Sequence, residues 1–589
     1  MLILAIENQR PVSALGIKTE MKTTRSILLL FLGAWLLLNL LQAGLTELDP
    51  DEAYYWAYAQ ELDWGYFDHP PMIALMIRIG STLLPGELGV RLMTILLSAL
   101  SLYLMWVLVG RPRERGALLT IMALLAAMPF LHVYGFVATP DSPLIFFTVL
   151  FFLTYQRFLR SGNWLNTLAW GACMAGLLYS KYHGVLIIGF TVLSNLQLLR
   201  RPKFYLAALW GALLFLPHLL WQIDNHFPSF RYHLMERNNV FEWKDLYSYL
   251  INQLVIFNPF IFPLLVAALI KRKPSEDNSL RTAERAYTFT IIGFWLFFFA
   301  MIIRGHVEPQ WTAVLSIPLV ALAYRYGLGR PRYQRRLRNL VLVSLLPILA
   351  FRVLIMKGVL EERIPLFHKR HWVYELEKEV GDLPVLFLNT FRGPSTYEFY
   401  TGNEAVAVNT ITAVRNNQYS LWDRGKILQG ERIVVLGDLG WPCEVCREVS
   451  LDGKARQYEI VDDFQAGMGL EFHILEVRQD WQAGATQRVL VEIHNPYGYD
   501  IRLRSGELPV RPVALFNPEP EVWRIAATRF ELPDNLIKAG ERRRVLMEFD
   551  LDPDWEGDYL FTIGVQIGNI PPLLPEAMIS VQVEGLGGN

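Results

Sequence analysis

The chain has 589 residues, of which 52% are hydrophobic and only 19% are charged, and its mean hydropathy is +0.25. A soluble protein of this length needs more charge to cover its surface, so the composition argues against a fully soluble fold. The formal net charge of −1 provides no basic excess, which argues against nucleic acid as a partner.

Apolar residues are concentrated before Lys357 in repeated segments of about 17–22 residues, the length that crosses the hydrocarbon core of a bilayer. About eleven spans are predicted, at residues 27–45, 91–110, 117–138, 142–158, 165–180, 184–199, 204–221, 248–270, 286–303, 311–327 and 339–357. The two short segments beside Lys181 could instead form one re-entrant pair. The stretch 72–84 is too short to span comfortably and is placed at the interface.

Basic residues occupy alternate turns between these segments. If the N-terminus lies in the cytoplasm, every inner turn is basic: residues 111–115, 157–160, 200–203, 271–273 and 325–338. This is the positive-inside pattern, and an odd number of spans then exports the tail into the periplasm of a bacterium. The reactive polar residues fall on the outer side, whereas a transporter would bury such groups near mid-membrane. The pattern therefore favours an enzyme at the outer face of the inner membrane.

The first outer loop concentrates carboxylates and aromatic residues beside the membrane. Asp51 and Glu52 follow Pro50, which suits the first turn of a helix. One interpretation is that the two carboxylates cap a short interfacial helix. The other is that one of them is a general base that takes a proton from an attacking hydroxyl.

Three further motifs on the outer side carry charge. Asp68-His69 form either a polar turn or a contact to an anion or a metal, since Asp and His supply oxygen and nitrogen ligands. Asp141 either caps the following span or joins the same site. Lys181, at a break between two apolar segments, either snorkels to the interface or neutralises a phosphate.

The longest outer loop of the membrane part, residues 222–247, offers further ligands. His226, Arg231 and His233 could contact a metal or a phosphate, and their spacing does not choose between these roles.

Taken in chain order, these motifs resemble the GT-C glycosyltransferases that use polyprenyl-phosphate sugars. The resemblance is to the bacterial branch related to protein O-mannosyltransferases and to the lipid A aminoarabinose transferase, of the glycosyltransferase family 39/83 type. It covers roughly residues 25–360. It rests on Asp51-Glu52, Tyr66-Phe67-Asp68-His69-Pro70-Pro71, Thr139-Pro140-Asp141-Ser142-Pro143-Leu144 and Ser180-Lys181.

The resemblance implies roles for individual residues. Catalytic roles fall to Asp51, Glu52 and Asp141, with Asp51 as the base; donor-phosphate binding falls to His69, Lys181 and Arg231; and a divalent cation, where one takes part, falls to Asp68, His226 and His233. The aminoarabinose transferase has a lysine where this chain has His69, so the charge at this position becomes dependent on pH. The resemblance implies no nucleotide cofactor.

The implied reaction is an inverting transfer of one sugar from a polyprenyl-phosphate donor in the membrane to an acceptor hydroxyl. The acceptor could be a lipid, a glycan or a protein. One alternative is a flippase or other transporter of lipid-linked sugars, without transferase activity, which predicts polar residues inside the spans. Another is a scaffold that only presents its soluble tail.

The expected fold is a polytopic α-helical membrane protein of the GT-C type with C-terminal soluble α/β and β-sandwich domains. The predicted domains are a cytoplasmic tail at residues 1–24, the transmembrane glycosyltransferase domain at 25–357, a periplasmic α/β domain at 358–465 and a periplasmic β-sandwich at 466–589. Alternating apolar strands and turn residues indicate the last two. Cys443 and Cys446 form a Cys-x-x-Cys motif that suits a local disulfide, and no second pair is present to complete a zinc site.

Overall fold

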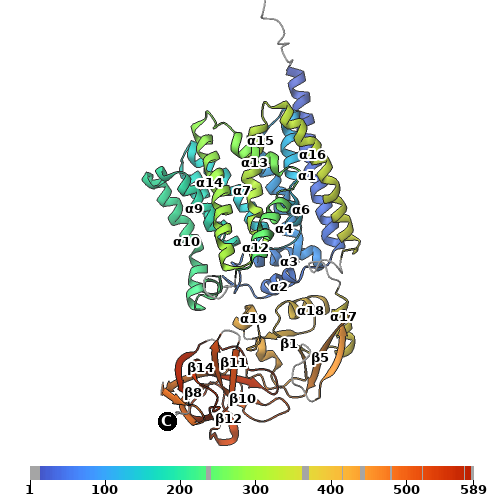
Figure 1. Cartoon of the computed structure of the whole chain (residues 1–589). Helices are drawn as coiled ribbons and strands as arrows, with labels where there is room; N and C mark the ends of the chain where they lie inside the picture. The colour runs from blue at the N-terminus through green and yellow to red at the C-terminus, as the bar shows by residue number, and fades with distance from the viewer. Residues whose placement is uncertain are drawn as a thin grey trace, which may run out of the picture. The chain divides into compact units, whose positions relative to one another are not determined.

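The computed structural model describes residues 14–233, 241–360, 370–413, 415–422, 424–437, 445–477, 480–519, 522–575 and 577–585. The chain divides into two compact units, Met1–His368 and Lys369–Asn589, which we call the helical unit and the β-rich unit (Figure 1). Each unit is described by itself.

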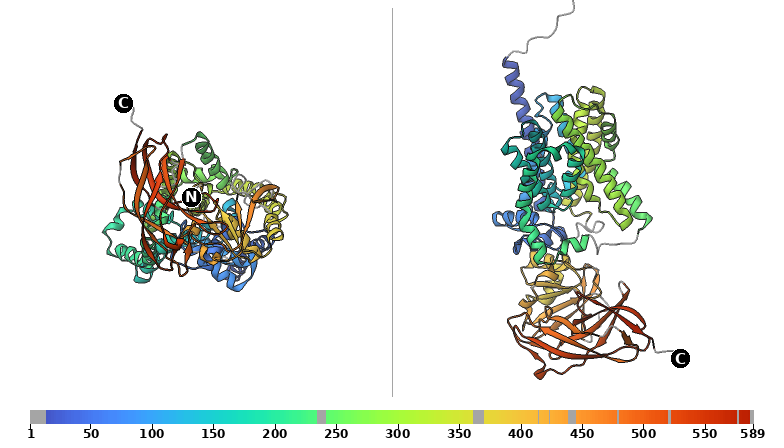
Figure 2. Two further views of the ribbon diagram at one scale, coloured as in Figure 1. Left: turned by 90° about the horizontal axis from the view of Figure 1, so that it is seen from below. Right: turned by 90° about the vertical axis from the view of Figure 1, so that its left-hand side faces the viewer.

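The helical unit is a bundle whose long helices run roughly parallel to one another (Figures 1 and 2). Its helices are α1 Ala14–Leu45, α2 Pro50–Gln60, α3 Met72–Leu83, α4 Gly86–Leu108, α5 Arg115–Ala126, α6 Pro129–Val133, α7 Asp141–Arg160, α8 Trp164–Ser180, α9 Gly184–Ser194, η1 Leu196–Arg200, α10 Pro202–Asp224, α11 Pro228–Arg231, α12 Trp243–Ile256, α13 Phe262–Lys271, α14 Asn278–Met301, η3 Ile302–Arg304, η4 Pro309–Leu315, α15 Ser316–Gly327 and α16 Pro331–Met356.

Six helices of the described chain are long and apolar enough to cross a membrane on their own: α1 from Thr24, α4, α7, α10, α14 with η3, and α16. The other predicted spans are also helical but are shorter or interrupted, and the stretch at 72–84 forms the 12-residue helix α3. The prediction of a polytopic helical membrane protein is confirmed.

Three predicted spans, 117–138, 184–199 and 248–270, are wrong as continuous helices. The segment 184–199 is interrupted at Asn195, between α9 and η1. The segment 117–138 stops at Ala127 and restarts as α6 at Pro129, because proline has no N–H to continue the helix. The segment 248–270 breaks at Asn258, whose φ of 67° is left-handed. The breaks at Ala127 and Asn258 meet, since Asn258 Nδ2 donates to the carbonyl of Ala127 at 2.8 Å. This bond satisfies a carbonyl that the break at Ala127 leaves unpaired inside an apolar unit.

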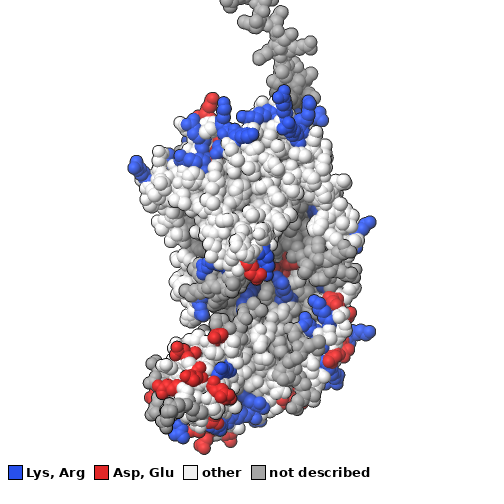
Figure 3. Space-filling model, viewed as in Figure 1, with Lys and Arg blue, Asp and Glu red and all other residues white. Residues whose placement is uncertain are grey.

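Charge is distributed unevenly along the helical unit. Figure 3 shows Lys and Arg side chains gathered at one end, next to a wide band without charged residues. The turns that join α4 to α5, α7 to α8, η1 to α10, α13 to α14 and α15 to α16 lie at this end and carry the basic residues predicted for the inner side (Figure 1). We call it the basic end.

Helices α8 and α10 touch backbone to backbone. A Cβ at Gly171 of α8 would lie 2.3 Å from the carbonyl oxygen of Ala207, and a Cβ at Gly211 of α10 would lie 2.8 Å from the carbonyl oxygen of Gly171. Gly171→Val is therefore expected to lower the stability of the helical unit by about 1–3 kcal/mol, because backbone atoms cannot move aside as a side chain can. A lowered thermal unfolding midpoint in detergent would show it.

Gly189 provides the matched control. It also lies inside a helix, α9, but a Cβ added there meets no atom within 4 Å. Gly189→Val introduces the same β-branched side chain and should leave the midpoint near that of the wild type. Equal effects of the two substitutions would show that helix propensity, and not the α8–α10 contact, sets the cost.

The β-rich unit opens with an α/β sheet of strand order β2-β1-β3-β5-β4. Strands β1 and β2 and strands β1 and β3 pair in parallel, and β5 pairs antiparallel with β3 and β4. The elements are α17 His371–Val380, β1 Val385–Leu388, α18 Arg392–Thr401, β2 Ala405–Val408, α19 Gln418–Leu421, η6 Arg424–Leu428, β3 Ile433–Gly437, β4 Arg447–Leu451 and β5 Lys454–Val461.

Two further sheets, in the orders β11-β10-β14-β15-β7 and β13-β8-β6, face each other as a sandwich. Phe561 of the first sheet and Phe549 of the second lie 5.5 Å apart between ring centroids, in a core that also includes Trp481. The strands are β6 Glu471–Glu476, β7 Asp480–Gln482, β8 Thr486–His494, β9 Ile501–Arg502, β10 Val510–Glu519, β11 Val522–Ala527, β12 Leu536–Ile537, β13 Arg542–Asp550, β14 Gly557–Ile567 and β15 Ile579–Glu584; β9 pairs with β12, and η7 is Pro533–Asn535.

The α/β sheet and the sandwich share one hydrophobic cluster within the β-rich unit. The boundary at residue 465 therefore stays a prediction. Cys446 is disulfide-bonded, Cys443 lies outside the described residues, and Cys173 is a free, buried thiol in α8.

Candidate active site

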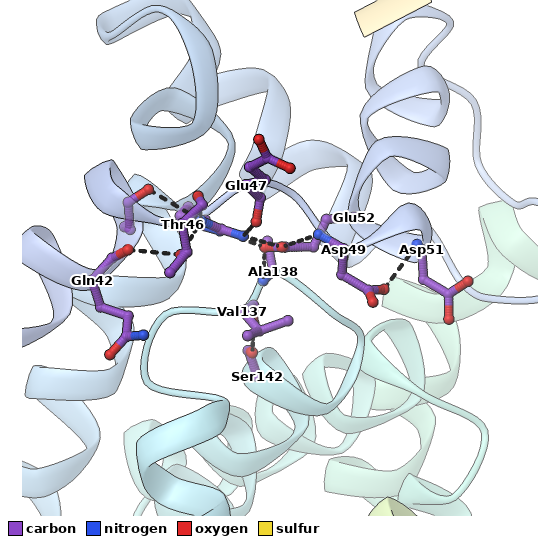
Figure 4. Close-up of polar contacts among 11 residues, drawn as sticks. Gln42, Thr46, Glu47, Asp49, Asp51, Glu52, Val137, Ala138 and Ser142 are labelled. Atoms are coloured by element: carbon purple, nitrogen blue, oxygen red, sulfur yellow. Dashed lines mark hydrogen bonds and ion pairs between the residues drawn. The ribbon is translucent and has the colours of Figure 1, made fainter. Parts of the chain in front are cut away.

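Helix α2 begins with a capping box, which places Asp51 in its first turn (Figure 4). Asp49 is the N-cap, and its Oδ1 accepts from the backbone N–H of Asp51 at 2.9 Å. The backbone N–H of Asp49 donates in turn to Glu52 Oε2 at 3.0 Å. Pro50 occupies the first helical position, where its missing N–H costs nothing. The predicted helix start is confirmed, with Asp49 and Glu52 as the capping pair.

The carboxylate of Glu52 is fully buried and bound by Arg91 of α4, whose side chain is 1% exposed. Arg91 donates through Nε to Oε1 at 2.9 Å and through Nη2 to Oε2 at 2.5 Å. The backbone N–H of Ala138 donates to Oε1 at 2.7 Å (Figure 4). With the N–H of Asp49, four donors surround the carboxylate. This geometry favours a positioning role for Glu52 over proton transfer.

Arg91 also connects this carboxylate to helix α1. Its Nη1 donates to the carbonyls of Ala43 at 3.1 Å and Thr46 at 2.7 Å, and its Nη2 donates to the carbonyl of Glu47 at 2.6 Å. One guanidinium therefore joins the end of α1, the start of α2 and α4. Through Glu52 it also holds the segment that precedes α7.

Asp68 is buried beneath the aromatic face of α2. Its Oδ2 accepts hydrogen bonds from the hydroxyls of Tyr54 at 3.1 Å and Tyr58 at 3.2 Å. Tyr58 stacks on Tyr66, with ring centroids 4.1 Å apart. Burial, and then the neighbouring Tyr54 and Asp68, raise the pKa of Tyr58 well above its usual value. Tyr58 therefore stays a protonated donor to Asp68.

The loop that leads to Asp68 is clamped onto the end of α10. Trp221 Nε1 donates to Asp63 Oδ2 at 2.6 Å, and its ring fills the space in which a Cβ on Gly65 would lie. Ser229 Oγ donates to the carbonyl of Tyr66 at 3.0 Å. Segments that are far apart in the sequence thus fix the backbone immediately before Asp68.

Asp141 and Lys181 form a buried ion pair. Lys181 Nζ lies 2.8 Å from each carboxylate oxygen of Asp141, and both residues are 6% exposed. Asp141 does not cap α7, because Pro140 is the N-cap and no side chain caps that helix end. Lys181 is the C-cap of α8, at the predicted break. The structure thus joins two residues that the sequence selected separately.

The remaining predicted residues lie around this centre. His69 is half-buried, with its ring 5.7 Å from that of Tyr55. His233 Nε2 lies 3.2 Å from the carbonyl oxygen of Asp68. His226 and Arg231 are exposed. Across the described residues, no three His, Cys, Asp or Glu side chains converge as a metal site, so the predicted set of Asp68, His226 and His233 is not brought together.

The sequence interpretation missed the partners that organise the site. Arg91 is the first residue of the predicted span 91–110, and Ala138 acts only through its backbone N–H. A lone arginine inside an apolar segment is the signal that could have identified Arg91, since a charge there needs a partner.

Comparison with known proteins finds a matching family model and solved structures of similar fold. Residues 68–221 match the family model described as dolichyl-phosphate-mannose-protein mannosyltransferase. A search of curated proteins finds no match. The crystal structure of ArnT from Cupriavidus metallidurans in the apo state has a TM-score of 0.56 and 14% identity, and the alignment covers 74% of this chain and 98% of that chain.

The structure of the same ArnT bound to undecaprenyl phosphate has a TM-score of 0.54 and 17% identity, with the same coverage of both chains. The residues matched by the family model run from Asp68 into α10 and so include Asp141 and Lys181. Residues 68–221 thus match a mannosyltransferase family model, and the fold of the chain is similar to that of ArnT.

Proposed function

We propose that the protein moves a single sugar from a polyprenyl phosphate to an acceptor hydroxyl, with inversion, at the outer face of a bacterial inner membrane. The observation that carries this proposal is the fold shared with ArnT, which was solved with undecaprenyl phosphate bound. The basic end of the helical unit supports a cytoplasmic placement for that end. The carboxylates in the first turns of α2 and α7 lie at the other end of the helical unit from the basic end (Figure 1). This placement would put them on the outer side.

Asp51 is the proposed general base. Glu52, Asp68 and Asp141 are all buried and bound by cationic or hydroxyl donors, whereas Asp51 is only partly buried. A base must reach the proton that it abstracts, so partial exposure in the first turn of α2 suits Asp51. The acceptor oxygen would bond to the anomeric carbon as the bond from that carbon to the phosphate oxygen breaks. The proton would pass to Asp51, and the electron pair would leave with the polyprenyl phosphate.

Lys181 is the proposed cationic contact to the leaving phosphate, with His69 and Arg231 as further contacts. Lys181→Met is expected to raise the donor KM or lower kcat by about 10- to 100-fold, the range of one lost hydrogen bond to a charged group. Steady-state kinetics over a range of donor concentrations measure this. Lys181→Met alone would leave the carboxylate of Asp141 buried without its cation, which could destabilise the protein. The double variant Asp141→Asn/Lys181→Met removes that unpaired charge and serves as the second variant.

Lys203→Met is the matched control for Lys181. Lys203 is exposed at the basic end, where it donates to the carbonyl of Gly162. This variant should keep wild-type kinetics. An unchanged KM and kcat in both Lys181 variants would contradict the phosphate role.

A transfer assay tests the function as a whole. Purified protein is incubated with radiolabelled undecaprenyl-phosphate sugars and a membrane extract that supplies acceptors, and label in a new product is measured. Transfer that Asp51→Asn abolishes supports the proposal. If no donor is consumed but the protein moves a labelled donor across vesicle membranes, the flippase alternative is correct.

A further inference from the structure

A second buried arginine, Arg352, lies in α16 and is 3% exposed. Its Nε donates to Gln42 Oε1 at 2.7 Å, and its Nη2 donates to Asn39 Oδ1 at 2.9 Å. Its Nη1 lies 3.2 Å from Nδ1 of His132 in α6. Within the described chain, every acceptor that contacts Arg352 is formally neutral or a backbone carbonyl. This guanidinium therefore differs from Arg91, which is neutralised by Glu52.

The hydrogen bonds of His132 define its tautomer. Its Nε2 lies 2.8 Å from the carbonyl oxygen of Ala126, which can only accept, so Nε2 carries the proton. Nδ1 then presents a lone pair to Arg352. His132 is a neutral acceptor in this arrangement, and the cluster of Asn39, Gln42, His132 and Arg352 keeps a full positive charge.

Phe136 connects this cluster to the candidate active site. The Cζ of Arg352 lies 5.3 Å from the centroid of the Phe136 ring, and the Cζ of Arg91 lies 5.5 Å from the same centroid. Two residues further along the chain, Ala138 N–H donates to Glu52. The segment 136–141 thus binds Glu52 through the N–H of Ala138 and leads directly into α7, which begins at Asp141.

We propose that Arg352 is a positioning residue for sugar transfer, which rests on the function proposed above. Arg352 fixes Phe136, and through Phe136 it fixes the segment that holds Glu52, the start of α2 and Asp141. A buried cation without a carboxylate partner is costly and is a functional candidate inside a membrane unit. Here the buried cation lies against Phe136, two residues before the backbone N–H that binds Glu52.

Kinetics distinguish positioning from simple structural support. Arg352→Met should lower kcat about 10- to 100-fold while the donor KM changes little, the cost of a small misplacement of reacting groups. Phe136→Leu should reproduce the loss, and the double variant should be no slower than either single variant, because both break one chain of contacts. Arg352→Lys, which keeps the charge, should recover part of the rate.

Arg325→Met is the control. Arg325 binds the buried Glu284 at the basic end, so its loss should reduce the yield of folded protein without lowering kcat per folded molecule. If wild type transfers sugar and Arg352→Met keeps the wild-type kcat, the positioning role is wrong. Multiplicative losses in the Arg352→Met/Phe136→Leu variant would contradict the route through Phe136.

Hydrogen exchange provides a readout that needs no substrate. In Arg352→Met, backbone amides of residues 136–141 and of the first turn of α2 should exchange faster than in wild type, while those of α14 stay unchanged. Unchanged exchange at 136–141 overturns the inference even if no donor is ever found. Faster exchange there in a protein that transfers no sugar supports the mechanical link and rejects only the proposed function.

Discussion

Asp51→Asn is expected to lower the rate of sugar transfer by about 100- to 10,000-fold, the contribution of a positioned general base. Asparagine has nearly the same shape as aspartate but cannot accept the acceptor's proton at neutral pH. The hydrogen bond from residue 51 to Asp49 uses the backbone N–H, so the start of α2 should remain intact. The measurement is kcat at saturating donor with protein whose folding has been verified by its thermal midpoint.

Glu61→Gln is the matched control for Asp51. Glu61 is an exposed carboxylate at the C-cap of the same helix, and the substitution removes the same charge at the other end of α2. It should leave kcat unchanged. A wild-type rate in Asp51→Asn would remove Asp51 as the base, and an equal loss in both variants would indicate a general electrostatic effect of the loop.

Local features of the site could be predicted from the sequence. Pro50 followed by Asp51 and Glu52 correctly marked the start of a helix, because proline and acidic residues both favour the first turn. The break at Lys181 was correct for a similar reason, since a charged residue interrupts two apolar segments. These signals depend on neighbours within a few residues.

The pairings within the site could not be predicted in this way. Asp141 and Lys181 were each recognised, but they are 40 residues apart and only the packing of α7 and α8 brings them together. The catalytic role of Glu52 is implied by the family resemblance and stays a prediction, but the sequence around Glu52 does not reveal its partners, Arg91 and the N–H of Ala138. Which side chains meet in a helical bundle depends on how each helix is rotated about its own axis. The apolar composition of a segment does not determine that rotation.

The interrupted spans show the same limit. Pro129 could have ended a helix from the sequence alone, and hydropathy masked it because the residues on both sides are apolar. The break at Asn258 is stabilised by the carbonyl of Ala127, 131 residues away. An isolated segment 248–270 has no such donor–acceptor partner, so continuous helix was the reasonable prediction for it.

Removing Arg91 is expected to have the largest effect on stability. Arg91→Met leaves Glu52 fully buried without its cation, and breaking one partner of a buried pair costs about 3–5 kcal/mol. Arg91 also supplies donors to three carbonyls at the end of α1, so the loss extends beyond the ion pair. A strongly lowered thermal midpoint of the purified protein, or failure to accumulate in the membrane, would show this.

The double variant Glu52→Gln/Arg91→Met separates the ion pair from the packing. Glutamine can still accept from the N–H of Ala138 but leaves no buried charge, so the double variant should be more stable than Arg91→Met alone. Lys244→Met removes a cation from the exposed pair with Glu242 and should leave the midpoint unchanged. If Arg91→Met were as mild as Lys244→Met, the Glu52–Arg91 pair could not be what holds α2 against α1 and α4, and the placement of Asp51 would need another cause.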